Sequence, residues 1–462
     1  MKALNLLRVL ANTDWGADRK VLLRLYRSLV RSKLDYGSIV YGSARKSYLK
    51  MLNTIHHQGL RLALGAFRTS PIESLLAEAN EPSLSLRREK LALNYITKVK
   101  ANPKNPVNEV LLNPKYETLY EKKPNAIPPL GIRLKSAIAD AGLKLESVRE
   151  QSISSIPPWT IKQPNVNFTL TSDKKSTTNP LEFQSKFNEL KSKYPNYTAI
   201  YTDGSKDNGK VGSASTSELH TSKVRLPDNS SIFSAEIQAI DLALRFASSI
   251  QRKNFIIFSD SLSVLQSLYN RNMSNPLVQQ LLIKHHKLSF SKNIIFCWLP
   301  SHVGIPGNEE ADRAAKSSLN LNEAKLKLPY TDFKPLINTF INSKWQISWN
   351  TVVNNKLHAI KPVLGDSRLS YRSVRKEEVV LARCRIGHTH VTHSYLLKQE
   401  EQPECVFCVE PFTVKHFLID CIDLALVRQK YFNVDSMFQL FNSVHYENIL
   451  SFLKEVHLYH KI

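Results

Sequence analysis

The stretch YTAIYTDGSK, residues 197–206, decides the fold, because its apolar and β-branched run ends on an aspartate followed by a glycine. A run of this kind is typical of a buried strand. Two more such runs are NFIIFSDSL at 254–262 and NIIFCWLPS at 293–301, and GKVGSASTS and SELHTSKVRL between 209 and 226 add two strands. Helical patterns alternate with strands in the second half. The pattern predicts an α/β domain with a mixed five-stranded sheet and flanking helices.

Four acidic residues in four separate motifs are candidate metal ligands. Asp203 and Asp260 end two of the strands, whereas Glu236 in SAEIQAI and Asp312 in GIPGNEEAD lie on helical patterns. In open α/β sheets, ligands bind at the carboxyl ends of the strands, so these side chains can converge. Four carboxylates in one place repel one another unless cations neutralise them. Any one of them alone is more often a cap or a surface charge, but together they suit a pair of Mg²⁺ ions that cut a phosphodiester.

Residues 196–320 resemble a type 1 ribonuclease H domain through YTDGSK, AEIQAI, FSDSLSVLQSL and WLPSHVGIPGNEEAD. The amino-acid sequences of these motifs resemble the ribonuclease H of non-LTR (LINE-type) retrotransposons more closely than they resemble the cellular enzyme. The resemblance implies a ribonuclease-H-like fold. It also implies hydrolysis of the RNA strand of an RNA–DNA hybrid with two Mg²⁺ ions, for which Mn²⁺ is an expected substitute.

The same resemblance implies a role for each matching residue. Asp203 would bridge both ions beneath the scissile phosphate. Glu236 and Asp260 would complete the site that stabilises the leaving 3′ oxygen, and Asp312 would hold the ion that activates water. His302 would assist proton movement or product release, although a plain exposed loop histidine fits the sequence as well.

Three further residues are expected to contact substrate. Gly204 lets a backbone come close to a ligand because it has no side chain, and Ser205 follows it in the same motif. Asn308 matches a substrate-contacting position of the family. It is an equally good cap for the closing helix, because asparagine is favoured at that position.

Length and charge set the broad class. The chain has 462 residues, which predicts two to four domains. Its 63 Lys+Arg against 40 Asp+Glu give a formal charge of +23. A surplus of this size favours a nucleic-acid partner bound through a basic surface over an acidic membrane, for which no lipidation motif or basic anchor is present. No secretory signal or membrane-spanning run is found, so an intracellular protein of nucleus or cytoplasm is expected. The oligomeric state stays open.

The cysteines are too few and too clustered for a disulfide framework. Cys405, Cys408, His416 and Cys421 form a C-x2-C-x7-H-x4-C pattern, which favours a closed tetrahedral zinc site over four reduced side chains in a small core. This C-terminal part of the chain also resembles the region that follows ribonuclease H in LINE-type elements. The resemblance implies that it is a nucleic-acid-binding knuckle. Surplus ligands upstream have a structural or RNA-facing role: Cys384, His388, His390 and His393.

The rest of the chain divides by composition. Residues 25–71 resemble the thumb-like segment after the reverse transcriptase palm of the same elements, and no aromatic-x-Asp-Asp string of a polymerase site is found. We therefore expect a C-terminal fragment of a longer polyprotein. The expected segments are a helical thumb remnant at 1–100, a Pro-rich linker at 101–195, the nuclease domain at 196–320, a helical connector at 321–375, a Cys/His module at 376–425 and a C-terminal helix at 426–462.

Two other functions remain in competition with an active ribonuclease. A catalytically inactive nucleic-acid-binding relic would keep the fold, the basic face and the zinc module. The intact set of four acids argues against it, because drift would strike such residues early. A related integrase or resolvase nuclease is disfavoured by the GNEEAD helix and by the lack of a second acidic domain.

Overall fold

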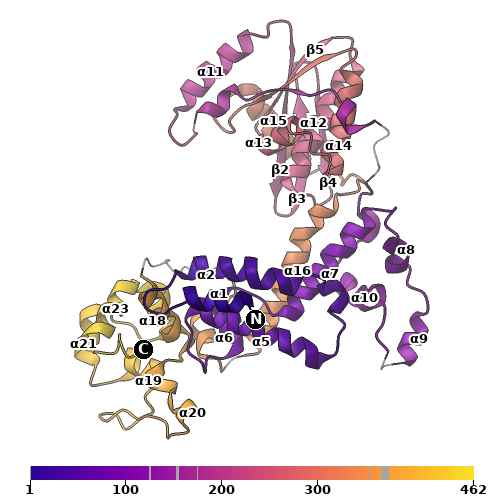
Figure 1. Ribbon diagram of the computed structural model, residues 1–462. Helices are drawn as coiled ribbons and strands as arrows, with labels where there is room; N and C mark the ends of the chain where they lie inside the picture. Colours follow the sequence, from indigo (N-terminus) through magenta and orange to yellow (C-terminus); the bar gives the residue numbers. More distant parts are fainter. Residues whose placement is uncertain (1, 124–125, 152–155, 174, 353, 366–373) are drawn as a thin grey trace. The chain divides into compact units, whose positions relative to one another are not determined.

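The computed structural model describes residues 2–123, 126–151, 156–173, 175–352, 354–365 and 374–462 (Figure 1). The chain forms two compact units, one made of Met1–Ala92 with Asn338–Ile462, the other of Leu93–Ile337. None of the described helices combines the length and the apolar character that crossing a membrane requires.

The second unit is built on a mixed sheet of six strands in the order β1-β6-β5-β2-β3-β4. The strands are β1 (Asn165–Asn167), β2 (Thr198–Asp207), β3 (Lys210–Thr216), β4 (Thr221–Leu226), β5 (Asn254–Ser259) and β6 (Asn293–Trp298). The mixed sheet with flanking helices is confirmed, but the predicted number of five strands is wrong. The added strand β1 runs parallel to β6, and its three residues are too few to show an alternating pattern.

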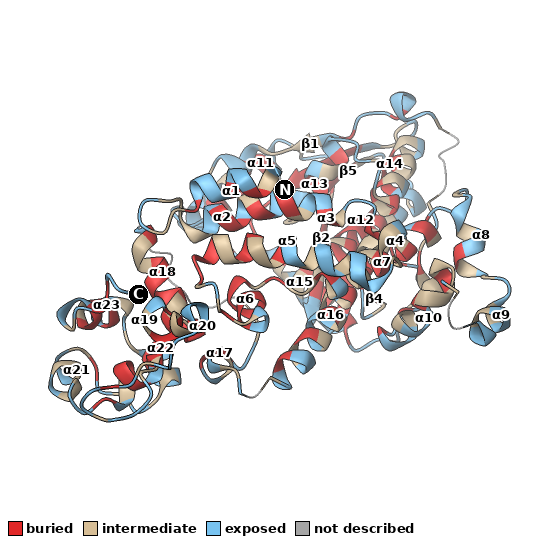
Figure 2. Ribbon diagram, turned by 60° about the horizontal axis from the view of Figure 1, so that its bottom comes forward, coloured by how far each residue is buried: buried red, intermediate tan, exposed pale blue. Residues whose placement is uncertain are grey.

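Alternate residues of the central strands fill two cores, one on each face of the sheet. Ile200, Phe255 and Ile257 pack with one set of helices, which are α12 (Ile232–Ser249), α13 (Leu262–Tyr269) and α14 (Pro276–Leu288). Tyr201 and Phe258 face the other side, towards α11 (Pro180–Ser192) and α15 (Pro306–Ser318). Figure 2 shows buried red segments on these helices and strands beside exposed blue ones. Burial on both faces explains why the strands are nearly continuous apolar runs.

The segment expected to be a Pro-rich linker contains secondary structure. It holds α8 (Val107–Leu112), α9 (Glu117–Lys122) and α10 (Leu130–Asp140), together with β1 and α11 of the sheet domain. Prolines start these elements rather than interrupting them, since Pro106 and Pro129 directly precede α8 and α10 and Pro180 opens α11. Proline is tolerated at a helix start because no intrahelical N–H bond is lost there.

The first unit is helical. Its N-terminal part holds α1 (Lys2–Leu10), α2 (Arg19–Leu25), the π-helix Tyr26–Arg31, α3 (Ser32–Asp35), α4 (Ser38–Tyr41), α5 (Lys46–Leu64), α6 (Ile72–Ala79) and the start of α7 (Leu84–Lys100). Its C-terminal part holds most of α16 (Phe333–Asn350), then α17 (Lys356–Ile360), α18 (Arg375–Ile386), α19 (His390–His393), α20 (Tyr395–Lys398), the π-helix His416–Asp420, α21 (Ala425–Tyr431), α22 (Met437–Ser443) and α23 (Tyr446–Glu455).

A buried carboxylate joins the two parts of this unit. Glu78 on α6 pairs with Arg19 of α2 at 3.0 Å and with Arg385 of α18 at 3.2 Å. Burial alone would raise the pKa of Glu78, but the two guanidinium groups hold it below its ordinary value. Trp345 and Trp349 of α16 are buried in the apolar cores of the same unit. The N-terminal helices and the C-terminal segment therefore share one fold.

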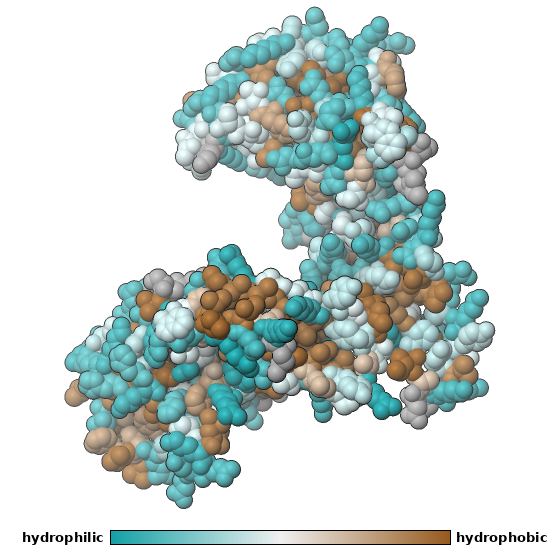
Figure 3. Space-filling model, viewed as in Figure 1, coloured by the Kyte–Doolittle hydropathy of each residue, from teal (hydrophilic) through white to brown (hydrophobic). Residues whose placement is uncertain are grey.

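Two features of the first unit were not predicted. The single C-terminal helix expected at 426–462 is interrupted, because capping residues lie within it: Ser436 accepts a hydrogen bond from the backbone of Gln439 and starts α22. In α1, Leu4 and Leu7 are buried whereas Leu6 and Val9 are exposed. Figure 3 shows the resulting brown apolar patch over α1 and α2. Hydrophobic spacing alone does not tell which of these leucines faces the core.

Candidate functional site

Three of the four predicted acids meet at one end of the sheet. Asp203 lies in β2, Asp260 directly follows β5, and Glu236 lies on α12. One carboxylate oxygen from each lies within 4.8 Å of the others. β2 and β5 are adjacent parallel strands whose pairing ends with Thr202 opposite Ser259, so the residues that follow, Asp203 and Asp260, lie side by side. The strand topology therefore brings together residues that are far apart in the sequence. Asp203 does not end its strand as predicted, because β2 continues to Asp207 in its antiparallel pairing with β3.

Gly204 allows Glu236 to join this group. A Cβ atom on Gly204 would lie 2.9 Å from both the Cβ of Ala235 and the backbone nitrogen of Glu236. The absence of a side chain thus lets α12 pack directly on β2 next to Asp203. The close packing of α12 on β2 is therefore sufficient to explain why residue 204 is glycine, and no contact with a ligand is needed to explain it. Contact between Gly204 and substrate stays a prediction.

The three carboxylates are costly to ionise together. Burial and the nearby charges of Asp260 and Asp312 raise the pKa of Asp203 to about 8. Burial raises the pKa of Glu236 well above its ordinary value, and the charges of Asp260 and Asp203 raise it further. Burial also raises the pKa of Asp260. Such shifts are typical of functional sites in which buried carboxylates lie close together, and bound cations would favour their ionised forms.

The donor set fits divalent metal ions. Glu236 Oε2 is buried and accepts no hydrogen bond from the described residues. A buried carboxylate oxygen without a donor is unfavourable, and a cation relieves that cost. Hard ions such as Mg²⁺ prefer carboxylate oxygen. Asp203, Glu236 and Asp260 therefore form a candidate metal site.

Asp312 belongs to a neighbouring group rather than to this triad. Its carboxylate, that of Glu309 and the ring of His302 lie within 4.8 Å of one another. Asp312 also pairs with Lys316 at 2.7 Å. The sequence argument did not single out Glu309. Its position three residues before Asp312 on α15 was the available signal, because residues at this spacing share a helix face.

The remaining predicted site residues have specific environments. His302 is exposed, and its backbone lies in the left-handed region with φ of +51°. Asn308 is not the helix cap, since α15 begins at Pro306 with Ile305 at the cap position. Its amide oxygen is instead buried without a partner among the described residues. Ser205 is buried within β2. Substrate contact by Asn308 and Ser205 stays a prediction.

The predicted zinc ligands also converge. Ligand atoms of Cys405, Cys408, His416 and Cys421 all lie within 4.8 Å of one another. The sulfur of Cys421 lies 3.9 Å from that of Cys405 and 3.9 Å from that of Cys408, and no disulfide joins them. Zn–S bonds of about 2.3 Å at tetrahedral angles place two sulfurs about 3.8 Å apart. The spacing of the thiols therefore fits one zinc ion.

Neighbouring groups prepare this cluster for a metal. The backbone of Cys408 and the nearby His416 ring lower the pKa of Cys405 to about 6, which favours its thiolate, whereas burial raises the pKa of Cys421 to about 11. His416 Nε2 is buried without a hydrogen-bond partner among the described residues, and Nδ1 lies 3.5 Å from Glu410 Oε2. A carboxylate on the second ring nitrogen is the usual support of a metal-binding histidine.

The upstream Cys and His residues lie in other environments. Cys384 is buried in the apolar core of the first unit, where burial raises its pKa to about 12. His388 and His393 stack with ring centroids 3.7 Å apart, and Lys356 Nζ lies 3.1 Å from His393 Nε2. These contacts give Cys384, His388 and His393 a structural role, one of the two roles expected for them.

The segment around the four Cys/His ligands, residues 399–423, has an acidic surface, unlike the chain as a whole. Residues 399–423 contain six carboxylates and one lysine, and all six acids are exposed. Phe407, between the first two cysteines, is 72% exposed. Phosphate binding dominates nucleic-acid affinity and requires positive charge. The local charge therefore does not support the expected role as a nucleic-acid-binding knuckle.

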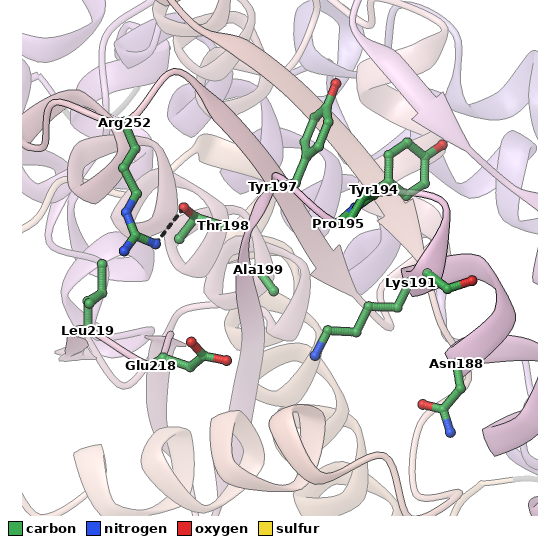
Figure 4. A pocket seen from close by; sticks show the side chains of 11 residues that line it. Asn188, Lys191, Tyr194, Pro195, Tyr197, Thr198, Ala199, Glu218, Leu219 and Arg252 are labelled. Carbon is green, nitrogen blue, oxygen red and sulfur yellow. Dashed lines mark hydrogen bonds between the residues drawn. The ribbon is translucent and has the colours of Figure 1, made fainter.

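A pocket of about 500 Å³ lies at the other end of β2 (Figure 4). Its lining includes Lys191, Tyr194, Glu218 and Arg252, and Arg252 donates a hydrogen bond to Thr198 Oγ1 at 3.1 Å. Thr198 begins β2, five residues before Asp203, so the pocket lies about 17 Å from the carboxylates along the strand. It is therefore separate from the metal site.

Comparison with known proteins places the sheet domain. Residues 195–320 match the protein-family model described as RNase H. Among solved structures, the chain is similar to the crystal structure of RNase H1 from the halophilic archaeon Halobacterium salinarum NRC-1. The sequences are 19% identical, with a TM-score of 0.23, and the match covers 27% of this chain and 98% of that one. Residues 195–320, which contain all four predicted acids, thus form an RNase H domain within a longer chain.

Proposed function

We propose that this protein hydrolyses the RNA strand of RNA–DNA hybrids with two divalent metal ions. The observation that carries the proposal is the convergence of Asp203, Glu236 and Asp260, with Asp312 close enough to raise the pKa of Asp203. The match of residues 195–320 to the RNase H family supports the substrate class. The formal charge of +23 supports binding to the phosphates of the hybrid.

The residues of the site divide into two sets of ligands. Asp203, Glu236 and Asp260 would hold one ion, and Asp203 with Asp312 the other, beside Glu309. Two such ions supply a stabilised attacking hydroxide and neutralise the leaving oxygen. A ring nitrogen of His302 lies within 4.8 Å of carboxylate oxygens of Glu309 and Asp312, and from this position the ring would accept or give a proton. Asn308 would orient the substrate strand through its amide group.

We also propose that the Cys/His cluster binds a structural zinc ion. The supporting observations are the 3.9 Å sulfur spacing and the contact between His416 and Glu410. Four protein ligands leave no open position, so the ion would stabilise the module and take no part in hydrolysis. An origin in a LINE-type retrotransposon rests on the sequence resemblance alone and stays a prediction.

A substrate panel tests the nuclease. The purified full chain is incubated with Mg²⁺ and end-labelled RNA–DNA hybrid, duplex DNA or duplex RNA of one sequence. We expect cleavage of the RNA strand of the hybrid only, and none in EDTA. Binding of the hybrid without any cleavage would support the inactive relic, and cleavage of duplex DNA would refute the assignment.

A further inference from the structure

A segment outside the family match packs against the nuclease site. Residues 168–173 and 175–192 precede the matched range of 195–320, yet they contribute to one core of the sheet. Leu170, Phe183, Phe187 and Leu190 lie in the same apolar cluster as Val303 and Ile305. These last two residues belong to the loop that begins with Ser301 and His302. The added segment therefore forms the support of the loop that carries the candidate proton-transfer residue.

Gln184 of α11 makes a specific contact with this loop. Its Nε2 donates a hydrogen bond to the carbonyl oxygen of Val303 at 2.8 Å. Gly304 has a φ of +78°, and a Cβ atom there would lie 2.5 Å from Gln184 Nε2. His302 also has a positive φ, which non-glycine residues rarely adopt. The amide of Gln184 thus holds a loop whose backbone conformation is unfavourable by itself.

A second residue of the segment brings a positive charge to the same loop. Lys175 Nζ donates a hydrogen bond to Ser301 Oγ at 3.1 Å, and its side chain is exposed. Ser301 directly precedes His302, whose ring lies within 4.8 Å of the carboxylate oxygens of Glu309 and Asp312. Lys175 forms no ion pair with a described carboxylate. Lys186 of α11, by contrast, is paired with Asp173 at 2.9 Å and Glu182 at 2.7 Å.

We propose that residues 168–173 and 175–192 complete the nuclease site: Gln184 positions the loop of His302, and Lys175 binds a phosphate of the substrate strand. The proposal rests on the proposed function and names residues that the family match does not include. An exposed ammonium group at the loop of His302 fits a backbone phosphate, because it adds affinity without depending on base sequence.

The positioning role is tested by a double-mutant cycle in the full chain. Gln184→Leu removes the donated hydrogen bond, and Gln184→Glu removes the donor at nearly constant size. We expect either change to lower kcat about tenfold with little change in KM, since small misplacement of a catalytic group is costly. In a His302→Ala background the same change should have no further effect. An equal loss in both backgrounds would show general damage and refute positioning. Ser185→Ala, an exposed neighbour on α11, is the matched control.

The phosphate contact predicts a different kinetic change. Lys175→Ala should raise KM several-fold at unchanged kcat. It should also reduce the slope of log(kcat/KM) against log salt by about 0.9, the value for one lost phosphate contact on duplex DNA. Lys175→Arg should restore both. Lys186→Ala, which removes a paired lysine of the same segment, should change neither. A salt slope unaltered by Lys175→Ala would refute the contact.

Two measurements separate this proposal from the proposed function. If the unmodified chain cleaves no hybrid, the nuclease assignment fails. Hybrid affinity of Lys175→Ala as a function of salt still decides the phosphate contact. Hydrogen exchange of the backbone amides at 301–305 still decides whether Gln184 holds the loop. We expect faster exchange in Gln184→Leu than in Ser185→Ala, and equal rates would refute the bracing role.

Discussion

The two candidate metal sites of this chain are built in opposite ways. The carboxylate site takes its ligands from β2, β5, α12 and α15, which span residues 198–318. The Cys/His cluster takes all four ligands from the 17 residues between Cys405 and Cys421. The first is assembled by a sheet with its own apolar cores, whereas the second lies among short helices and loops. The carboxylate site therefore depends on the fold of the sheet domain, whereas we expect the fold around the Cys/His cluster to depend on its metal.

The energetics follow from this contrast. Burial and the charges of neighbouring carboxylates raise the pKa of Asp203 and Glu236, so the ions of the proposed site would favour the ionised carboxylates. A zinc ion in the proposed Cys/His site would add its binding free energy to the stability of a segment whose Val414, Phe417 and Leu418 lie in the apolar core of the first unit. Loss of metal should therefore abolish activity in one site and structure in the other.

The largest expected effect is at Asp203. Asp203→Asn should reduce hybrid cleavage by more than about a thousandfold, because a central metal ligand loses its charge while its shape remains. The melting temperature of the metal-free domain should rise slightly, since repulsion within the carboxylate group decreases. Gel assays and thermal melts in EDTA measure both effects. Asp207→Asn, an exposed aspartate at the end of the same strand, is the control. If Asp203→Asn still cleaves the hybrid, Asp203 is not an essential metal ligand of the nuclease site.

The next effect is at the zinc cluster. Cys421→Ser should abolish bound zinc and destabilise the first unit by several kcal/mol, while cleavage of the hybrid changes little. Elemental analysis measures the bound zinc. Thermal melts monitored by hydrogen exchange measure the stability of each unit. Cys384→Ala removes a buried thiol of the same unit outside the cluster and should keep the zinc. If Cys421→Ser leaves the stability unchanged, the cluster is not a structural metal site.

A smaller effect concerns pH in the metal-free protein. The pKa of Asp203 is about 8 in the folded state against an ordinary value of 3.8, so the folded state binds more protons between these values. Stability contributed by the protonated group is present at low pH and is lost as pH rises towards 8. In EDTA, the melting temperature of the sheet domain should fall by about 5 °C between pH 5 and pH 8. Mg²⁺ should add most stability at pH 8. If the melting temperature of the unmodified chain in EDTA does not change with pH, or if Asp203→Asn shows the same pH dependence as the unmodified chain, the raised pKa of Asp203 is contradicted.

The smallest effect is expected at Phe407. The aromatic ring is exposed on an acidic module, so Phe407→Ala should change hybrid affinity less than about twofold. A knuckle that stacks bases would instead lose 1–3 kcal/mol per base, roughly fivefold or more. Fluorescence anisotropy with a labelled hybrid distinguishes the two results. A large loss would restore the nucleic-acid-binding role that the tail resemblance implies.

The sequence predicted the strands at Asp203 and before Asp260 because buried apolar runs have a strong local pattern. It placed Asp203 at the end of its strand, which is wrong, since β2 continues to Asp207 through its pairing with β3. It predicted the Cys/His ligands because their spacing is short. It failed where the signal was weak or ambiguous. Three-residue β1 shows no periodicity, and the prolines before α8 and α10 resemble linker prolines although they start helices. Asn308 has the right residue type for a cap, but Pro306 begins the helix two residues earlier.

The sequence by itself determined the chemistry of both sites: hard carboxylate oxygens at strand ends and a soft sulfur–nitrogen set within one short segment. Only the tertiary structure decided which side chains meet. It grouped Glu309 with Asp312 and His302, brought Gln184 to the loop of His302, and joined the first and last parts of the chain around Glu78. The physical reason is that local periodicity reflects burial within one element. Contacts between distant residues depend instead on how whole elements pack, which no single stretch of sequence records.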